Sequence, residues 1–228
     1  TPQSYGRKVG DHLRRNHLTA AKLHLPGLDH PERRLPVATL LVALRAARRA
    51  AGPEPVLAYD PQPGWAAGTE EEALTILRVM EDEGYEWLEE PYNWNAEGAI
   101  AKYAALCPKT TVIIQQEERG DCGYERFVRW ARAGAVGQWS YDVLIHGSIT
   151  QAVRILRWAA ANREERLVRV NLHWAWTPHV HLVASVDMEI APYFEDPYAE
   201  EIPPVEDDPA YAAVPTWPGI YRIDRLEA

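Results

Sequence analysis

The chain has 228 residues, of which 46% are hydrophobic, and its formal net charge is −9. This length suits one large α/β domain with a sizeable core, and the acidic balance argues against nucleic acid or an anionic membrane as the main partner. Two cysteines, Cys107 and Cys122, are too few for a disulfide framework and too isolated for a zinc site, so we expect a reducing, cytoplasmic setting. No apolar run reaches the roughly 18 residues of a membrane span, and we expect no targeting segment.

Predicted strands and helices alternate along most of the chain. Pro36 and Gly52 mark the two ends of one predicted helix, and Thr69 with Glu72 forms a capping box that begins the next. We expect this second helix to bury Leu74, Leu77, Val79 and Met80. The predicted strands cover about 1–6, 19–25, 56–60, 86–89, 111–116, 138–142, 167–171 and 188–194, and the predicted helices cover about 36–51, 70–83, 95–106, 124–133, 150–161 and 178–185.

This alternation predicts an α/β fold with parallel strands whose carboxyl ends share one face. We predict a TIM-type (β/α)7β barrel in a single domain, with residues 1–196 as the barrel and 197–228 as an extended, Pro-rich tail that wraps it. An open doubly wound sheet is the alternative. The barrel is preferred because polar candidates end nearly all the strands, whereas an open sheet would gather them at one switch point.

Three carboxylates stand where predicted strands end, namely Asp60, Glu89 and Glu117. A single acid in such a place is more often a helix cap or a solvated charge. Three acids on one face can converge on a hard divalent cation such as Mg²⁺, which takes oxygen ligands. Together with the Glu89-Glu90-Pro91 sequence, they predict a magnesium site.

Further polar residues complete a pattern: Lys22 and His24 on the second predicted strand, and Asp142, His173 and Glu195 at or near the ends of later strands. Two sequences in this pattern are specific, Trp87-Leu88-Glu89-Glu90-Pro91 and Asn171-Leu172-His173. The pattern resembles the barrel domain of the enolase superfamily, mandelate racemase subgroup, which includes the sugar-acid dehydratases. The resemblance runs from Tyr5 to Ile220.

The resemblance implies that the three strand-end carboxylates bind Mg²⁺. It implies that His173 with Asp142 forms an acid/base dyad, that Lys22 is the first lysine of a Lys-x-Lys pair, and that Glu195 hydrogen-bonds a substrate carboxylate. The implied activity is that of a lyase. Such an enzyme dehydrates a sugar acid, an aldonate or aldarate, by removing the proton α to the carboxylate through an enediolate intermediate.

The chain departs from the family pattern at three places. His24 stands where the second lysine is usual, so His24 is a candidate base or acid. Gln116-Glu117-Glu118 replaces a usual Gly-Glu, which makes Glu118 the alternative third ligand. The family's N-terminal capping domain is absent before Thr1, so we expect a cap elsewhere or in a second subunit, a homo-oligomer, and poor catalysis by this chain without a cap.

Two other functions stay open. A racemase, epimerase or cycloisomerase would use the same enediolate, and His24 opposite His173 is compatible with either reaction. A non-catalytic isolated barrel is the alternative of another class. We interpret His179 and His181, in the helix after the last-but-one strand, as structural histidines, with His181 on the apolar side.

Overall fold

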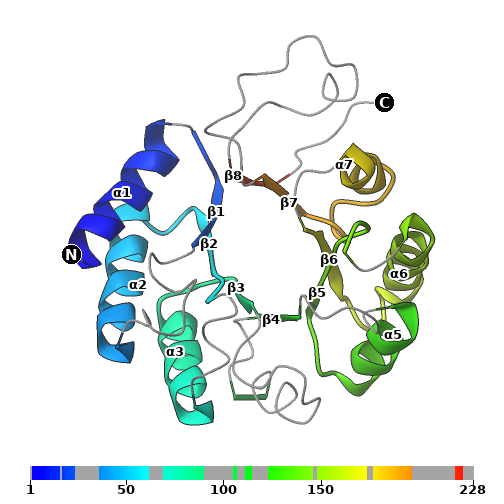
Figure 1. Cartoon of the computed structure of the whole chain (residues 1–228), viewed down its shortest axis with the longest axis horizontal. Coiled ribbons are helices and arrows are strands. Elements are labelled where there is room, and N and C mark those ends of the chain that lie inside the picture. Colours follow the sequence, from blue (N-terminus) through cyan, green and yellow to red (C-terminus); the bar gives the residue numbers. More distant parts are fainter. Residues whose placement is uncertain are drawn as a thin grey trace. The chain divides into compact units, whose positions relative to one another are not determined.

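The computed structural model describes a large part of the chain, and this part is built from alternating strands and helices (Figure 1). The α/β class is therefore confirmed. The described helices contain none with the length and apolarity that crossing a bilayer requires. The chain divides into two compact units, Thr1–Ile114 and Gln115–Ala228. The described residues are 2–15, 17–23, 36–61, 69–89, 105–106, 111–114, 123–145, 148–173, 177–196 and 219–222.

In the described part of the first unit, four strands run parallel and the helices α1, α2 and α3 pack along one side of them (Figure 1). In the strand register Lys22 lies opposite Ala58, and Ala58 lies opposite Trp87. Since these strands are parallel and in register, they end at the same edge of the sheet. The elements are α1 (Pro2–Arg15), β1 (Ala20–Leu23), α2 (Val37–Ala51), β2 (Val56–Tyr59), α3 (Glu70–Asp82), β3 (Trp87–Glu89) and β4 (Thr111–Ile114).

The predicted boundaries of the helices over 36–51 and 70–83 are confirmed, whereas the helix predicted over 95–106 lies outside the described residues except for 105–106. Pro36 precedes the first turn of α2, and Gly52, with φ of 83°, ends it by donating its N–H to the Arg48 carbonyl at 3.0 Å. In α3 the Thr69 hydroxyl accepts the Glu72 N–H at 3.3 Å, and the Glu72 carboxylate accepts the Thr69 N–H at 3.0 Å. Both orphan donors of the first turn are satisfied, as a capping box requires.

The buried face of α3 agrees with the predicted one except at Leu74. Leu77 is buried as expected, but Leu74 is only half-buried. Val79 and Met80 are buried as expected, and Ala73 and Ile76 join them in the core. Ala73, Ile76 and Met80 follow the i, i+3, i+7 spacing of a single helical stripe, which the alanine at its start obscures in the sequence.

The predicted strand over residues 1–6 is wrong, because α1 occupies this segment and packs on α2. A Cβ atom added to Gly6 would lie 2.5 Å from the Ala46 carbonyl, and one added to Gly10 would lie 2.5 Å from the Ala50 carbonyl oxygen. The two glycines therefore let the helix backbones approach closely. Their low helix propensity and lack of apolar side chains gave the sequence no helical signal.

Arg48 hydrogen-bonds the backbone just before two strands of this unit. Its guanidinium donates to the carbonyls of Pro55 at 2.7 Å and of Gly84 at 2.8 Å, just before β2 and β3. Beside it, the Tyr85 hydroxyl donates to the Leu44 carbonyl at 2.9 Å. Burial raises the pKa of Tyr85, so the hydroxyl remains a neutral donor. These bonds fix the start of the strands whose other ends carry candidate site residues.

Among its described residues, the second unit has three parallel strands and one antiparallel strand. The antiparallel strand comes from the segment predicted as a wrapping tail and pairs with β7, with Glu195 opposite Ile220. The elements are β5 (Gln138–Tyr141), α5 (Tyr124–Ala133), α6 (Ile149–Asn162), β6 (Arg169–Leu172), α7 (Thr177–Ala184), β7 (Tyr193–Asp196) and β8 (Gly219–Arg222).

The strand predicted over 188–194 begins later than expected, at Tyr193. Residues 188–190 form a turn that Asp187 organises. The Asp187 carboxylate accepts the Glu189 N–H at 3.0 Å, and its carbonyl accepts the Ile190 N–H at 2.9 Å. An aspartate that bonds the backbone two residues on is a turn former, and this local bond outweighs the apolar character of the segment.

The side chains of β5 alternate between two environments. Trp139 packs edge-on against Phe127 and Trp130 of α5, with ring centroids 5.6 and 6.1 Å apart. Successive side chains of a strand point to opposite faces, so Ser140 faces away from that aromatic cluster. Asp142 follows in the same alternation and shares the face of Ser140. The aromatic packing on one face thereby sets the direction of the acid at the strand end.

Candidate active site

Three charged side chains meet at the carboxyl edge of the first unit. Lys22 lies on β1, Asp60 directly follows β2, and Glu89 is the last residue of β3. The Asp60 N–H donates to the Leu23 carbonyl at 3.1 Å, which continues the strand pairing up to the acid. The parallel register brings residues far apart in sequence to one edge.

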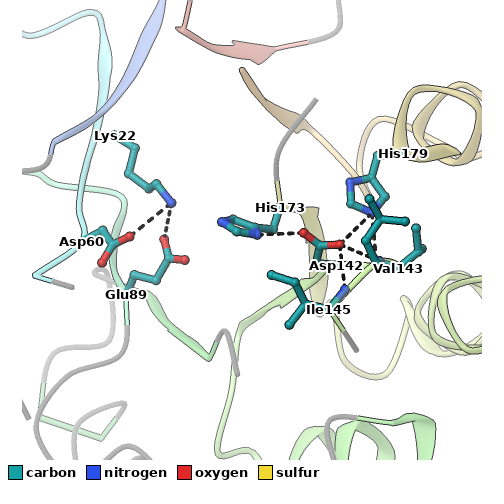
Figure 2. A network of polar contacts seen from close by, with 9 residues as sticks. Lys22, Asp60, Glu89, Asp142, Val143, Ile145, His173 and His179 are labelled. Carbon is teal, nitrogen blue, oxygen red and sulfur yellow. Dashed lines mark hydrogen bonds and ion pairs between the residues drawn. The ribbon is translucent and has the colours of Figure 1, made fainter. Parts of the chain in front are cut away.

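Both carboxylates contact the same ammonium group. The Lys22 Nζ lies 3.3 Å from Asp60 Oδ2 and 3.1 Å from Glu89 Oε2, as Figure 2 shows. Asp60 is 8% exposed and Glu89 is 1% exposed. Two acids buried to this extent repel one another unless a cation lies between them. This edge of the sheet is therefore a place that binds positive charge.

The donor set at this edge fits a hard cation, since carboxylate oxygens are the ligands that Mg²⁺ prefers. Two of the three expected ligands, Asp60 and Glu89, converge here. Glu117 and the alternative Glu118 lie outside the described residues. Within the described part of the chain, no cluster of three or more His, Cys, Asp or Glu side chains suited to a metal is found. The three-ligand site therefore stays a prediction.

The shared ion pair predicts how a Lys22→Met variant should behave. Removing the ammonium leaves two buried carboxylates without this compensation, so we expect the free energy of unfolding to fall by about 3 kcal/mol in metal-free buffer. Mg²⁺ should restore more stability to the variant than to the wild type, because it supplies the missing positive charge. Thermal melts with and without Mg²⁺ measure both effects.

Lys8→Met, at an exposed position on α1, is the matched control for that experiment and should melt like the wild type. Equal melting of Lys22→Met and wild type in metal-free buffer would contradict the compensating role of the lysine. Equal stabilisation of the two by Mg²⁺ would contradict a metal site at this edge.

The second unit contains a buried histidine–aspartate pair. His173 Nδ1 lies 3.0 Å from Asp142 Oδ2, with His173 9% exposed and Asp142 fully buried (Figure 2). The carboxylate can only accept, so Nδ1 carries the donated proton and Nε2 carries the lone pair of the neutral ring. This is the orientation that a histidine base needs, with the acid fixing its tautomer.

The loop after β5 wraps around the Asp142 carboxylate. The N–H groups of Leu144 and Ile145 donate to Asp142 Oδ1 at 2.7 and 3.2 Å. With the His173 bond on Oδ2, the carboxylate accepts from three N–H donors. Such bonds favour the ionised acid and hold it in one orientation.

Sequence reasoning missed the place of His179 in this constellation. His179 is 0% exposed, and its Nε2 accepts the Val143 N–H at 3.0 Å, within the loop that holds Asp142 (Figure 2). His181, expected on the apolar side, is instead exposed, because positions 179 and 181 lie on opposite sides of α7. In the sequence, His179 stands next to the apolar Val180, Leu182 and Val183, which indicates that His179 is buried. Helical spacing alone does not show that a buried His179 lies close to Asp142.

For the remaining candidates the structure describes no side chain. His24 lies outside the described residues. Glu195 lies on β7, where only its backbone is described. Their expected roles as second base and as substrate ligand stay predictions.

The chain matches a known family over residues 5–220, under the description Enolase C-terminal domain-like. It belongs to that family. Comparison with curated proteins gives no significant match.

Solved structures with the same fold include dehydratases and racemases. D-glucarate dehydratase from Agrobacterium tumefaciens, complexed with magnesium, is 24% identical with a TM-score of 0.68, over 82% of this chain and 46% of that one. A racemase from Streptomyces coelicolor A3(2) with bound magnesium is 20% identical with a TM-score of 0.67, over 85% and 48%. L-talarate dehydratase from Polaromonas sp. JS666, with Mg and L-glucarate, is 20% identical with a TM-score of 0.63, over 78% and 45%. This chain thus spans less than half the length of each.

Proposed function

We propose that the chain is the catalytic barrel of a Mg²⁺-dependent lyase that dehydrates a sugar acid, an aldonate or aldarate. The observation that carries the proposal is the buried His173–Asp142 pair, joined at 3.0 Å. The pairing of Asp60 and Glu89 around one positive charge supports it. Membership of the enolase-like family and the magnesium-bound dehydratases of the same fold support it further.

In this proposal Asp60 and Glu89 hold the metal together with Glu117, for which Glu118 is the alternative. When bound, Mg²⁺ supplies Lewis-acid stabilisation of the negative charge that builds on the substrate carboxylate. Lys22 contacts the substrate carboxylate. Lys22 contacts the carboxylates of Asp60 and Glu89, which are metal ligands in the proposal. The lysine would therefore lie next to the metal.

His173 is the proposed base that takes the proton from the α-carbon. Its Nδ1–H donates to Asp142, so Nε2 is the nitrogen that receives a proton, and the aspartate stabilises the cationic ring that results. The protonated ring then assists departure of the β-hydroxyl as water, and the enol product becomes a 2-keto-3-deoxy acid. His24 is the proposed second acid or base, and Glu195 the proposed hydrogen-bond partner of the substrate carboxylate.

We also propose that residues 1–196 close into a TIM-type barrel and that 197–228 form a Pro-rich tail, from which β8 pairs with β7. A capping domain or second subunit would complete the substrate pocket, and we expect a cytoplasmic homo-oligomer. The family match and the fold of the solved structures support the barrel.

A racemase or epimerase is the second candidate, favoured by the magnesium-bound racemase of the same fold. Incubation with a panel of aldonic and aldaric acids and Mg²⁺, followed by a 2-keto acid assay, separates the two. Keto acid formation supports dehydration. Exchange of the α-proton with solvent, without formation of keto acid, points to racemisation or epimerisation. If no acid gives either keto acid or exchange, even when a cap domain is supplied, the result points to a non-catalytic barrel.

A further inference from the structure

His179 lies in the loop network of Asp142 with a defined protonation state. It is 0% exposed on α7, and its Nε2 accepts the Val143 N–H at 3.0 Å. An accepting Nε2 carries no proton, so the ring is neutral in this bond and its proton is on Nδ1. The ring acts here as a buried hydrogen-bond acceptor.

The three successive N–H groups after Asp142 are shared between two acceptors. The first, from Val143, goes to His179, whereas those of Leu144 and Ile145 go to Asp142 Oδ1. The loop is therefore held from the helix side and from the carboxylate side at once. A shift of the Val143 peptide would carry the next two N–H groups with it and turn the carboxylate they hold.

The role of His179 as an acceptor also matters for Asp142, which lies close to it. Its Nε2 lies 3.8 Å from Asp142 Oδ1 (Figure 2). A donor at this point would compete with the Leu144 and Ile145 N–H groups for Oδ1 and could turn the carboxylate away from His173. An acceptor directed at Val143 does not compete, so Oδ2 remains aligned with His173 Nδ1 at 3.0 Å.

We propose that His179 is a positioning residue for the acid/base pair, acting through Val143 and the loop around Asp142 to orient His173. Its effect on turnover rests on the function proposed above, whereas its effect on the orientation of His173 does not. A merely space-filling histidine would be replaceable by any side chain of similar volume.

Three variants separate positioning from packing. His179→Gln keeps an acceptor near the ε position, and His179→Phe keeps the volume without the acceptor. His181→Phe makes the same change two residues along α7 at an exposed position, and is the matched control. Should His179→Phe not fold, His179→Met replaces it, because methionine adapts to irregular cavities.

The first readout needs neither metal nor substrate. Nitrogen-resolved proton NMR detects the slowly exchanging proton on His173 Nδ1, assigned by its loss in His173→Asn. We expect this signal in the wild type, in His181→Phe and in His179→Gln, and its loss or broadening in His179→Phe. An unchanged signal in a folded His179→Phe protein would overturn the proposal.

The second readout divides kcat from KM. We expect His179→Phe to lower kcat by about 10- to 100-fold, as for the loss of groups that orient a site residue. KM and Mg²⁺ stabilisation should change little, and His179→Gln should recover most of kcat. Equal loss in the Gln and Phe variants would contradict positioning through the acceptor. If the wild type turns over no acid, the proposed function fails, and the NMR signal still decides the role of His179.

Discussion

Replacing His173 with asparagine should reduce turnover by about 10³- to 10⁴-fold while the fold persists. The asparagine amide keeps a donor near the position of Nδ1, so Asp142 still accepts a hydrogen bond. What the variant lacks is the second ring nitrogen, which we propose to be the base. We expect the free energy of unfolding to change by no more than about 1 kcal/mol, because the buried carboxylate keeps its donors.

Initial rates of keto acid formation, together with thermal melts, test this prediction. The Mg²⁺-dependent rise in melting temperature should be the same in His173→Asn and wild type, since the histidine is not a proposed ligand. Turnover within about tenfold of wild type would remove His173 from the chemistry. His181→Phe serves as the control and should retain full activity.

Replacing Glu89 with glutamine should remove both metal binding and activity. Glu89 is 1% exposed and, like Asp60, contacts the Lys22 ammonium group. Its carboxylate therefore supplies one of the two negative charges that attract a cation to this edge of the sheet. For the wild type, Mg²⁺ at 100 times its Kd should add about 2.7 kcal/mol of stability, or roughly 5–10 °C in melting temperature. For Glu89→Gln we expect affinity at least about 100-fold weaker, since even groups that merely orient a ligand contribute about 10- to 100-fold.

Titration of the melting temperature with Mg²⁺ measures this loss. Glu86→Gln, just before the first residue of the same strand, is the matched control and should respond to Mg²⁺ like the wild type. A Glu89→Gln protein that Mg²⁺ stabilises as strongly as the wild type would show that the metal binds elsewhere.

The parts of the fold that the sequence predicted well are those with a local physical cause. The side chains of Thr69 and Glu72 each accept the backbone N–H of the other residue, and both lie within four residues of sequence. The start of α3 can therefore be predicted from the sequence. The strand ends at Asp60 and Glu89 could also be predicted, because a short apolar run ends at each of them. Parallel pairing then implied one common edge.

The parts that it missed depend on tertiary contacts. Gly6 and Gly10 belong to a helix because Ala46 and Ala50 of α2 lie against them, and no local propensity indicates this. His179 reaches the acid loop because α7 returns to Val143, a residue 36 positions earlier. Spacing along a helix identifies its buried face but not the loop that this face contacts.

Deuterium incorporation at the α-carbon of an aldonic or aldaric acid measures most directly whether Mg²⁺ and His173 act together on a carbon acid. In deuterium oxide with Mg²⁺, we expect the wild-type chain to replace the α-proton with deuterium, slowly without a cap. Chelation of the metal or the His173→Asn substitution should stop the exchange. Exchange that continues without Mg²⁺ or without His173, or a wild type that exchanges none of these acids even when a cap domain is supplied, would contradict the proposed chemistry.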